Sequence, residues 1–209
     1  MLITLEGGEG AGKSTQARLI IRELKKRRIR CLLTAEPGGT TIGKKIRKLL
    51  LDRTNAIMAP RAELLLYQAD RAQHVNEKIR PALEAGYVVV SDRFFDSSVV
   101  YQGYCRKLGV DEVYDLSLFA TGGLEPDLTF FLDLDPKVGF MRIRHRGSLD
   151  RLEREKIRFH QDVRRGFLGL ARRCRGRMVV IDASASTEEV NGAILSTLER
   201  RLRALRKSR

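Results

Sequence analysis

The residues best suited to chemistry form a glycine-rich segment near the start of the chain, GGEGAGKS at positions 7–14. It matches the pattern G-x-x-x-x-G-K-[ST] in full, between a strand-like run and a helical pattern. Glycines let the backbone approach a ligand closely, and the amides of such a loop surround a phosphate. Lys13 can place a cation on the β- and γ-phosphates of a nucleoside triphosphate, and the Ser14 hydroxyl can ligate Mg²⁺. The predicted phosphate-binding residues are Gly7, Gly8, Glu9, Gly10, Ala11, Gly12, Lys13, Ser14 and Thr15.

A second group of polar residues follows the apolar run YVVVS at positions 87–91. Asp92 ends this run and should lie beside the glycine-rich loop, where it could hold Mg²⁺ directly or through water. Arg93 comes next, at the carboxyl edge of the sheet, where ligands bind in open α/β folds. Its guanidinium could grip the phosphate of an acceptor. The chain has no NKxD segment for reading guanine, which favours an enzyme over a regulatory GTPase.

Two further patterns suggest contacts with a ligand. Tyr67 and Arg71 lie one turn apart in an otherwise apolar helical pattern, so they could stack on a base and bind its edge. A core tyrosine beside an arginine that reaches solvent would show the same spacing. Residues 141–173 form an arginine-rich helical hairpin pattern, which suits either a mobile lid over a triphosphate or a solvated charged helix. The arginines expected on one face of it are Arg151, Arg154 and Arg158.

The elements that must position these residues alternate along the chain. Short apolar runs alternate with helical patterns, which indicates a parallel sheet covered by helices in a single α/β domain, residues 1–209. The expected strands are Leu2–Glu6, Arg30–Ala35, Tyr87–Ser91, Asp127–Leu132 and Met178–Ile181. The expected helices are Lys13–Arg28, Ile42–Leu51, Pro60–Glu84 (in which Pro81 could cause a break), Ser97–Tyr104, Val110–Thr121, Pro136–Arg146, Leu152–Cys174 and Thr187–Leu205.

The composition limits the classes of protein to which the chain can belong. Hydrophobic residues make up 43% of the 209 residues, enough for one sizeable core. No apolar run approaches the roughly 20 residues of a membrane helix, and the N-terminus lacks the pattern of a secretory signal. Three scattered cysteines argue against a disulfide framework or a zinc site, so we expect a cytoplasmic protein. The net charge of +14 indicates an anionic partner, either nucleotide phosphate or nucleic acid.

Several motifs, taken together, resemble those of the bacterial thymidylate kinases over nearly the whole chain. They are LEGGEGAGKST at 5–15, AEPGGT at 35–40, LLYQADRAQH at 65–74, DRFFDSSVVYQG at 92–103, PDLTFFLD at 126–133, RIRHRGSLDRLE at 142–153 and IDAS at 181–184. The combination of AEPGGT with DRFFDSSVVYQG is far more specific than the phosphate-binding loop alone. The resemblance implies an α/β, three-layer P-loop kinase fold: a five-stranded parallel sheet flanked by helices, with a helical lid at about 142–155.

The resemblance also implies an activity, with its cofactors and partners. The activity is transfer of the γ-phosphoryl group of ATP to dTMP, giving dTDP and ADP in dTTP synthesis, with Mg²⁺ as cofactor. The implied partners are dTMP, ATP and a second copy of the chain in a homodimer. The implied catalytic residues are Glu9, Lys13, Arg93, Arg146 and Arg151, and the implied metal ligands are Glu9, Ser14 and Asp92. The implied acceptor-binding residues are Glu36, Tyr67, Arg71, Arg93, Ser98, Tyr101 and Gln102.

Individual roles follow from the same resemblance. Tyr67 would stack on thymine, and Arg71 would bind its carbonyl group. Ser98 and Gln102 would read the pyrimidine edge, while Tyr101 would crowd the 2′ position of the sugar. Arg93 would hold the dTMP phosphate and bridge to the γ-phosphate.

The resemblance also implies roles for residues that contact ATP. The loop before Asp182 would flank adenine, with Asp182 itself among the ATP-binding residues. Glu9 would help to organise Mg²⁺ and the acceptor site. Because the loop has no arginine between Glu9 and Gly12, the catalytic arginine would come from the lid, as Arg146 or Arg151.

Three positions depart from the family pattern, and two other functions stay open. Ala35 replaces an arginine, while Tyr67 and Leu152 each replace a phenylalanine. Another nucleoside monophosphate kinase, for UMP, CMP or dGMP, would differ around Arg71 and Tyr101. A non-catalytic P-loop protein that binds nucleic acid would account for the charge. Its basic segments lack the interleaved aromatic residues of single-strand binders, so we expect no nucleic-acid partner.

Overall fold

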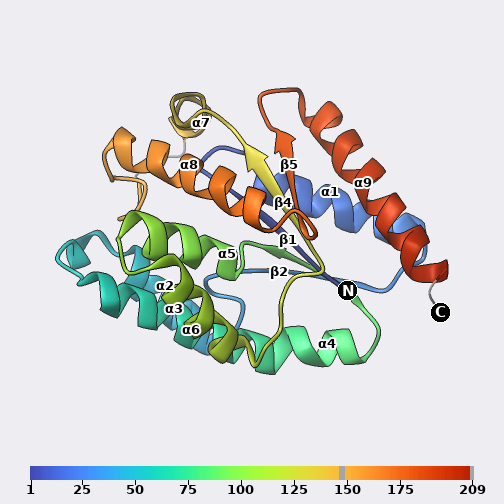
Figure 1. Ribbon diagram of the computed structural model, residues 1–209, viewed down its shortest axis with the longest axis horizontal. Coiled ribbons are helices and arrows are strands. Elements are labelled where there is room, and N and C mark those ends of the chain that lie inside the picture. Colours follow the sequence, from blue (N-terminus) through green and yellow to red (C-terminus); the bar gives the residue numbers. More distant parts are fainter. Residues whose placement is uncertain (146–148, 208–209) are drawn as a thin grey trace.

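A parallel sheet forms the centre of the computed structural model, which describes residues 1–145 and 149–207 (Figure 1). Within these residues the sheet has five strands in the order β2-β3-β1-β4-β5, and each neighbouring pair is parallel. The strands are β1 Leu2–Gly7, β2 Cys31–Ala35, β3 Val88–Asp92, β4 Leu128–Asp133 and β5 Met178–Asp182. The predicted α/β architecture is therefore confirmed.

Helices connect the strands, and several begin where their sequence can cap a free amide. Thr40 accepts a hydrogen bond from the Gly43 amide at the start of α2, and Asp135 accepts one from the Lys137 amide at the start of α7. The α-helices are α1 Lys13–Lys26, α2 Thr41–Leu51, α3 Pro60–His74, α4 Arg80–Glu84, α5 Phe95–Ser98, α6 Val110–Thr121, α7 Pro136–Ile143, α8 Ile157–Arg173 and α9 Thr187–Lys207. Three further helical elements are not α-helical: η1 Arg53–Asn55 is a 3₁₀-helix, and η2 Val75–Ile79 and η3 Val99–Cys105 are π-helices.

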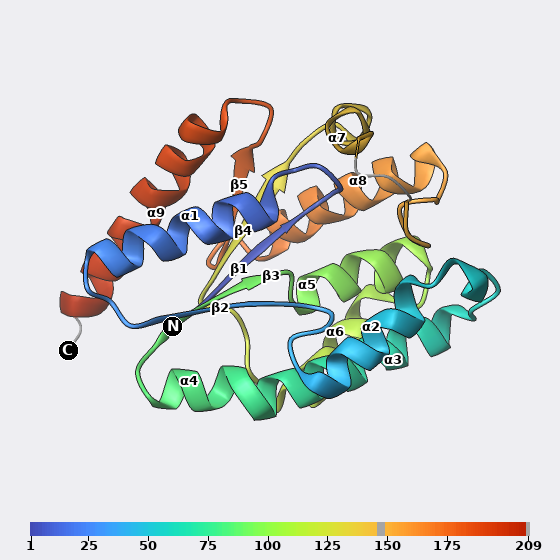
Figure 2. The same cartoon turned by 180° about the vertical axis from the view of Figure 1, so that it is seen from behind.

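The two faces of the sheet carry separate hydrophobic clusters, because successive side chains of a strand point to opposite faces. On one face, Ile3 of β1 clusters with Ile20 of α1 and Ile194 of α9. On the other face, Leu2 of β1 belongs to a cluster that includes Phe167 of α8. Figures 1 and 2 show α1 and α9 on one side of the sheet and the remaining large helices on the other. The result is a three-layer structure.

The predicted helical segment from Pro60 to Glu84 is continuous, and the break that Pro81 could have caused does not occur. The π-helical turn η2 ends at Ile79, two residues before Pro81. A proline has no amide to donate and its ring crowds the preceding turn, and the wider π-turn accommodates both features without ending the helix.

The arginine-rich hairpin also differs from the prediction. Residues 149–156 form turns, and α8 begins only at Ile157, so the expected helix from Leu152 was wrong over its first turn. The Asp150 carboxylate accepts hydrogen bonds from the amides of Leu152 and Glu153, both at 2.9 Å, and so stabilises a turn. Arg151 and Arg154 consequently do not share a helical face with Arg158.

One lid residue and the question of membrane-spanning helices concern the chain as a whole. Arg146, expected in the lid, lies outside the residues that the structure describes. Among the described residues, no helix combines the length and apolar character needed to cross a bilayer.

Candidate functional site

A cleft of about 680 Å³ opens at the carboxyl ends of the central strands, and the glycine-rich loop forms one of its walls. This is the sheet edge at which open α/β folds bind ligands. One set of lining residues follows β1, namely Glu9, Gly10, Gly12, Lys13, Ser14 and Thr15. The other set is formed by Glu36, Tyr67, Arg71, Asp92, Arg93, Ser98, Tyr101 and Gln102. The structure thus brings together most of the residues that the sequence suggested for donor and acceptor.

The glycine-rich loop connects β1 to the N-terminus of α1. Gly10 and Gly12 have φ angles of 70° and 90°, which favour glycine, and Gly12 is the N-cap of α1. The Lys13 ammonium donates to the carbonyl oxygens of Gly8, at 2.7 Å, and Gly7, at 3.1 Å. Burial, together with the charge of Arg93, lowers the pKa of Lys13. An anion over this loop would favour the charged form of Lys13, as a phosphate does.

Oxygen atoms suited to a divalent cation lie at the start of α1. The Ser14 hydroxyl donates a hydrogen bond to the Asp92 carboxylate at the end of β3. Hydroxyl and carboxylate oxygens fit the preference of Mg²⁺, which keeps several waters and uses few protein ligands beside phosphates. The described residues contain no group of three or more His, Cys, Asp or Glu that could hold a metal.

Arg93 has a left-handed backbone conformation, with φ of 70°, which is rare for a residue with a side chain. Its own amide donates to the Leu5 carbonyl at 3.0 Å. The buried Glu6 carboxylate accepts from the Phe94 amide at 2.8 Å and from the Ser97 hydroxyl at 2.6 Å. These bonds hold the strained turn in place, so β1 fixes the position of the arginine that follows β3.

The Arg93 side chain lies among polar groups of both walls of the cleft. It donates to Glu9 at 2.8 Å and to Ser97 at 3.1 Å. Its guanidinium also lies 5.4 Å from the centre of the Tyr101 ring. A cation held in this way could contact phosphates bound on either side.

Glu6 is an acid that the sequence argument did not single out. Burial, together with the negative charge of Asp96, raises its pKa to about 7. A fully buried carboxylate with two hydrogen-bond donors is therefore poised between its charged and neutral forms near neutral pH.

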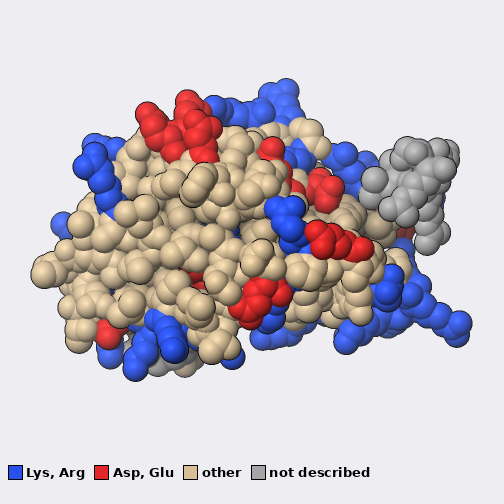
Figure 3. All heavy atoms as spheres, turned by 90° about the horizontal axis from the view of Figure 1, so that it is seen from below, with Lys and Arg blue, Asp and Glu red and all other residues tan. Residues whose placement is uncertain are grey.

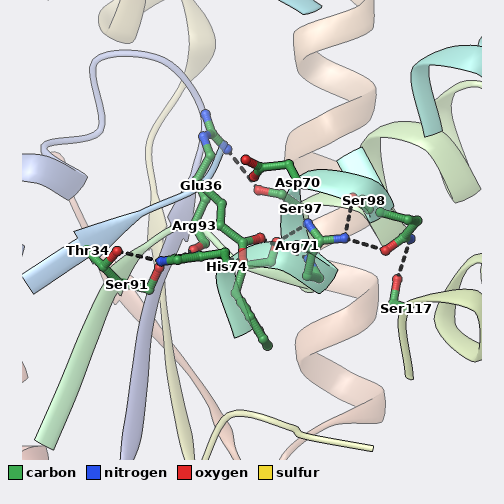
Figure 4. Close-up of polar contacts among 12 residues, drawn as sticks. Thr34, Glu36, Asp70, Arg71, His74, Ser91, Arg93, Ser97, Ser98 and Ser117 are labelled. Atoms are coloured by element: carbon green, nitrogen blue, oxygen red, sulfur yellow. Dashed lines mark hydrogen bonds and ion pairs between the residues drawn. The ribbon is translucent and has the colours of Figure 1, made fainter. Parts of the chain in front are cut away.

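Arg71 is fully buried, with 1% of its surface exposed. Its guanidinium donates to Glu36 at 2.9 Å, to Gln68 at 2.8 Å and to Ser98 at 3.1 Å. Figure 4 shows these contacts as part of a longer polar network that runs from Thr34 through His74 toward Ser117. The alternative of an arginine that reaches solvent was wrong, because Arg71 is buried and all of these partners belong to the protein.

Comparison with known proteins agrees with this arrangement. A sequence profile of the family described as "Thymidylate kinase" matches residues 5–194. A thymidylate kinase of Carboxydothermus hydrogenoformans is 52% identical over 197 residues, which cover 94% of this chain and 96% of that protein. A thymidylate kinase of Halothermothrix orenii is 51% identical over 199 residues, or 93% of this chain and 94% of its own. The chain belongs to the thymidylate kinase family.

A solved structure supports the same assignment at the level of the fold. The crystal structure of thymidylate kinase from Ehrlichia chaffeensis superposes with a TM-score of 0.79 at 29% identity, covering 95% of this chain and 98% of that one. The P-loop kinase fold of the thymidylate kinase family is therefore the fold of this chain.

Two residues expected in the site, Asp182 and Arg151, are not among the described residues that line this cleft. Asp182 ends β5, and its carboxylate accepts from the Ser184 amide at 2.9 Å; it is outside the set of described residues that line the cleft. Arg151 is buried and directs its guanidinium to Glu63 of α3, at 2.5 Å, and to the Leu50 carbonyl, at 2.8 Å. The structure does not bring Arg151 to the phosphate-binding loop.

The departure at Ala35 also has a structural context. Ala35 lines the cleft, and so do Lys44 and Arg47 of α2. The cationic side chains on this part of the wall therefore come from α2 rather than from β2.

Besides Glu6, sequence reasoning missed two residues near the site, Gly139 and Glu63, and the first of them matters through close packing. A Cβ atom built on Gly139 of α7 would overlap the Glu9 carbonyl oxygen, and one built on Gly10 would overlap the Gly139 carbonyl oxygen. Glycines in α7 and in the phosphate-binding loop thus let the two backbones touch. Glu63 could have been found from the sequence, because it is an acid one turn before Tyr67 in an otherwise apolar helical pattern, and a buried acid needs a partner.

Proposed function

We propose that this chain transfers the γ-phosphoryl group of ATP to dTMP, giving dTDP and ADP. Family membership supports a nucleoside monophosphate kinase whose relatives are named thymidylate kinases. The observation that supports the proposal is the cleft itself, because the glycine-rich loop, Arg93 and the buried Arg71 all line it. Donor and acceptor phosphates bound on these two walls would meet at Arg93.

The proposed chemistry needs alignment and charge neutralisation more than proton transfer. The oxygen of the acceptor phosphate is already ionised near neutral pH, so no strong general base is required. Lys13 and Arg93 are the cations of the described residues that we place on the phosphates. Ser14 and Asp92, with Glu9 nearby, would hold Mg²⁺, which supplies further neutralisation of phosphate charge when bound.

The acceptor wall is suited to a pyrimidine nucleotide. Tyr67 would stack on the base, while Arg71, held by Glu36, Gln68 and Ser98, would bind a base carbonyl. Because every one of these bonds is within the protein, the guanidinium is oriented before a ligand arrives. Preorganisation of this kind lowers the entropic cost of binding.

Gln102 and Tyr101 complete this wall. The Gln102 amide would contact the base edge, and Tyr101 would lie against the 2′ position of the sugar. The Tyr101 hydroxyl lies 3.5 Å from Arg93, so the proposed sugar contact and the proposed phosphate contact are neighbours. Asp182 stays a proposed residue of the adenine side, near the end of β5.

The lid arginine that contacts the transferred phosphoryl group is proposed to be Arg146, since Arg151 forms an ion pair with Glu63. Its position before Gly147 in the segment RIRHRG places it after α7, which contacts the phosphate-binding loop through Gly139.

We also infer that residues 1–209 act as one domain in a cytoplasmic homodimer. Figure 3 looks onto the side of α3, α4 and α6 and shows a broad tract of uncharged side chains. On these helices Leu65 and Phe119 are exposed to 58% and 85%. Apolar helix faces of this kind suit a second copy of the chain, which light scattering of the purified protein would detect as twice the chain mass.

The test of the proposed function is turnover with a panel of monophosphates in an ADP-coupled assay. We expect ATP consumption that depends on dTMP, weaker turnover of dUMP, and little with UMP, CMP or dGMP. Faster turnover of UMP, CMP or dGMP than of dTMP would show that the acceptor is not dTMP. No consumption with any monophosphate, together with salt-dependent binding of DNA or RNA, would instead identify a nucleic-acid-binding protein.

A further inference from the structure

Glu63 of α3 is a buried acid to which the proposed chemistry gives no role. Only 1% of its surface is exposed. Its two carboxylate oxygens bind two different parts of the chain. One accepts from the Gln102 amide at 2.8 Å, and the other accepts from the Arg151 guanidinium at 2.5 Å. A carboxylate in this setting is stable only while its partners stay in place.

Arg151 belongs to the segment 149–156, which leads into α8. Besides Glu63, its guanidinium binds the Leu50 carbonyl at 2.8 Å, and its amide donates to the Leu51 carbonyl at 3.3 Å. Both ribbon views show this segment reaching away from α7 toward α2 and α3 (Figures 1 and 2). The segment is therefore docked on the acceptor side of the cleft, where Asp150, Leu152 and Glu153 line the wall.

A second arginine reinforces the same docking. Arg106, directly after η3, contacts Glu63 at 3.4 Å and Glu155 at 2.6 Å, and its guanidinium lies 4.9 Å from the centre of the Phe159 ring. Two arginines and two glutamates thus balance their charges across three separate elements. Removal of Arg151 would leave Glu63 with Arg106 as its arginine partner, at the longer distance of 3.4 Å.

The other oxygen of Glu63 constrains Gln102 in the acceptor wall. Because the Gln102 NH₂ group donates to Glu63, the orientation of the amide is set. Its carbonyl oxygen is left to accept from a ligand. The state of Glu63 therefore determines which hydrogen-bonding group Gln102 can offer in the cleft.

We propose that Glu63 is a positioning residue that couples docking of the segment 149–156 to acceptor recognition by Gln102. The inference rests on the proposed function, because it assigns the acceptor to the wall that contains Gln102. When the segment 149–156 undocks, Glu63 loses the positive charge of Arg151. Its carboxylate then keeps Gln102 and Arg106 as partners and shifts toward them, which changes the position of the Gln102 amide. Coupling is reciprocal, so an acceptor that fits Gln102 also stabilises the docked segment.

The inference is tested by measuring dTMP affinity without ATP, by calorimetry, in R151A, R151K, E63Q and the double variant E63Q/R151A. We expect R151A to weaken dTMP binding about tenfold, within the range of ordinary coupling between sites. R151K should recover part of the loss, because a lysine keeps the charge but not the two-bond geometry. The double variant should bind dTMP more tightly than the product of the single effects predicts, since no unpaired buried charge is left.

The matched control is R173A, which removes an exposed arginine that pairs with Asp111 on the surface. It should leave dTMP affinity within twofold. A direct role of Arg151 on ATP phosphates makes the opposite forecast: dTMP affinity without ATP is unchanged in R151A, and KM for ATP rises. That result, or single effects that simply multiply in the double variant, overturns the coupling.

Two further readouts separate this outcome from other failures. Circular dichroism and melting temperature identify a variant that does not fold, in which case R151K and E63Q carry the test. A wild-type protein that neither binds dTMP nor consumes ATP with it would contradict the proposed function itself, which is a different result from wild-type binding that R151A leaves unaltered.

Discussion

The Nη2 atom of Arg93 lies 2.8 Å from a carboxylate oxygen of Glu9. One residue follows β3 and the other belongs to the loop after β1, so the ion pair joins the two sides of the cleft. The ion pair holds the guanidinium in place. A phosphate that enters the cleft would meet a cation whose position is already set.

This relationship predicts a large and selective effect of Arg93→Ala. We expect phosphoryl transfer to fall by about 10³-fold or more, as for other arginines that neutralise a transferring phosphoryl group. ATP binding should survive, because Lys13 and the loop amides are untouched. The ADP-coupled assay measures the first effect and calorimetry with ATP the second. Arg93→Lys is the control and should lose less activity; turnover close to wild type in Arg93→Ala would remove this residue from the site.

Glu6 predicts a pH dependence of stability. Burial raises its pKa in the folded protein to about 7, from the 4.5 of an ordinary glutamate. The folded state thus holds a proton that the unfolded state releases, so the contribution of Glu6 to stability is full below about pH 4.5 and is lost as the pH rises toward 7. Across this window the loss is about 3 kcal/mol.

Glu6→Gln should abolish that part of the pH dependence, since an amide can still accept from Phe94 and can donate to Ser97. Urea unfolding at pH 5 and pH 8 measures it: the difference in free energy between the two pH values should be smaller in the variant by about 2 kcal/mol. Equal pH dependence in both proteins would show that Glu6 titrates at an ordinary pKa.

The contact between α7 and the phosphate-binding loop predicts that Gly139→Ala disturbs the site. The added methyl group would displace the Glu9 carbonyl, and small displacements of a catalytic loop can cost about 10²-fold in rate. We expect kcat/KM for ATP to fall by at least tenfold, although alanine favours a helix by about 1 kcal/mol. Steady-state kinetics with varied ATP measures the change.

Gly169→Ala provides the control for this substitution. Gly169 also lies in a helix. Apart from its chain neighbours and the nearby backbone of its own helix, no atom in the described part of the chain lies within 4 Å of a Cβ built there. It should gain up to about 1 kcal/mol in stability and keep its activity. If both alanine variants behave alike, the contact between Gly139 and the loop has no effect on the site.

The buried pair of Arg71 and Glu36 predicts a strong effect on stability. Glu36→Gln removes the countercharge of a fully buried guanidinium, for which a loss of about 3 kcal/mol is expected. Urea unfolding measures this loss. Asp111→Asn, which breaks an exposed pair with Arg173, should change stability by less than about 0.5 kcal/mol. A loss of similar size in both variants would show that Arg71 finds another anionic partner.

Much of the fold and of the donor site could be predicted from the sequence. Glycines at 10 and 12, a lysine at 13 and a flanking strand and helix act within one short stretch of chain, so their spacing already determines the loop. The five strands are likewise local patterns of apolar residues, and each observed bound lies within one residue of the predicted one. The ordered motifs identified the family for the same reason.

The tertiary structure alone decided which side chains meet. Glu63 and Arg151 are 88 residues apart, and Glu6 and Phe94 are equally distant, so no local pattern records either contact. Arg151 looked like one of several lid cations, and only its burial against α3 distinguishes it from Arg154. The phosphate-binding loop is a property of consecutive residues, whereas the partners of a buried charge depend on how distant helices pack against the same sheet.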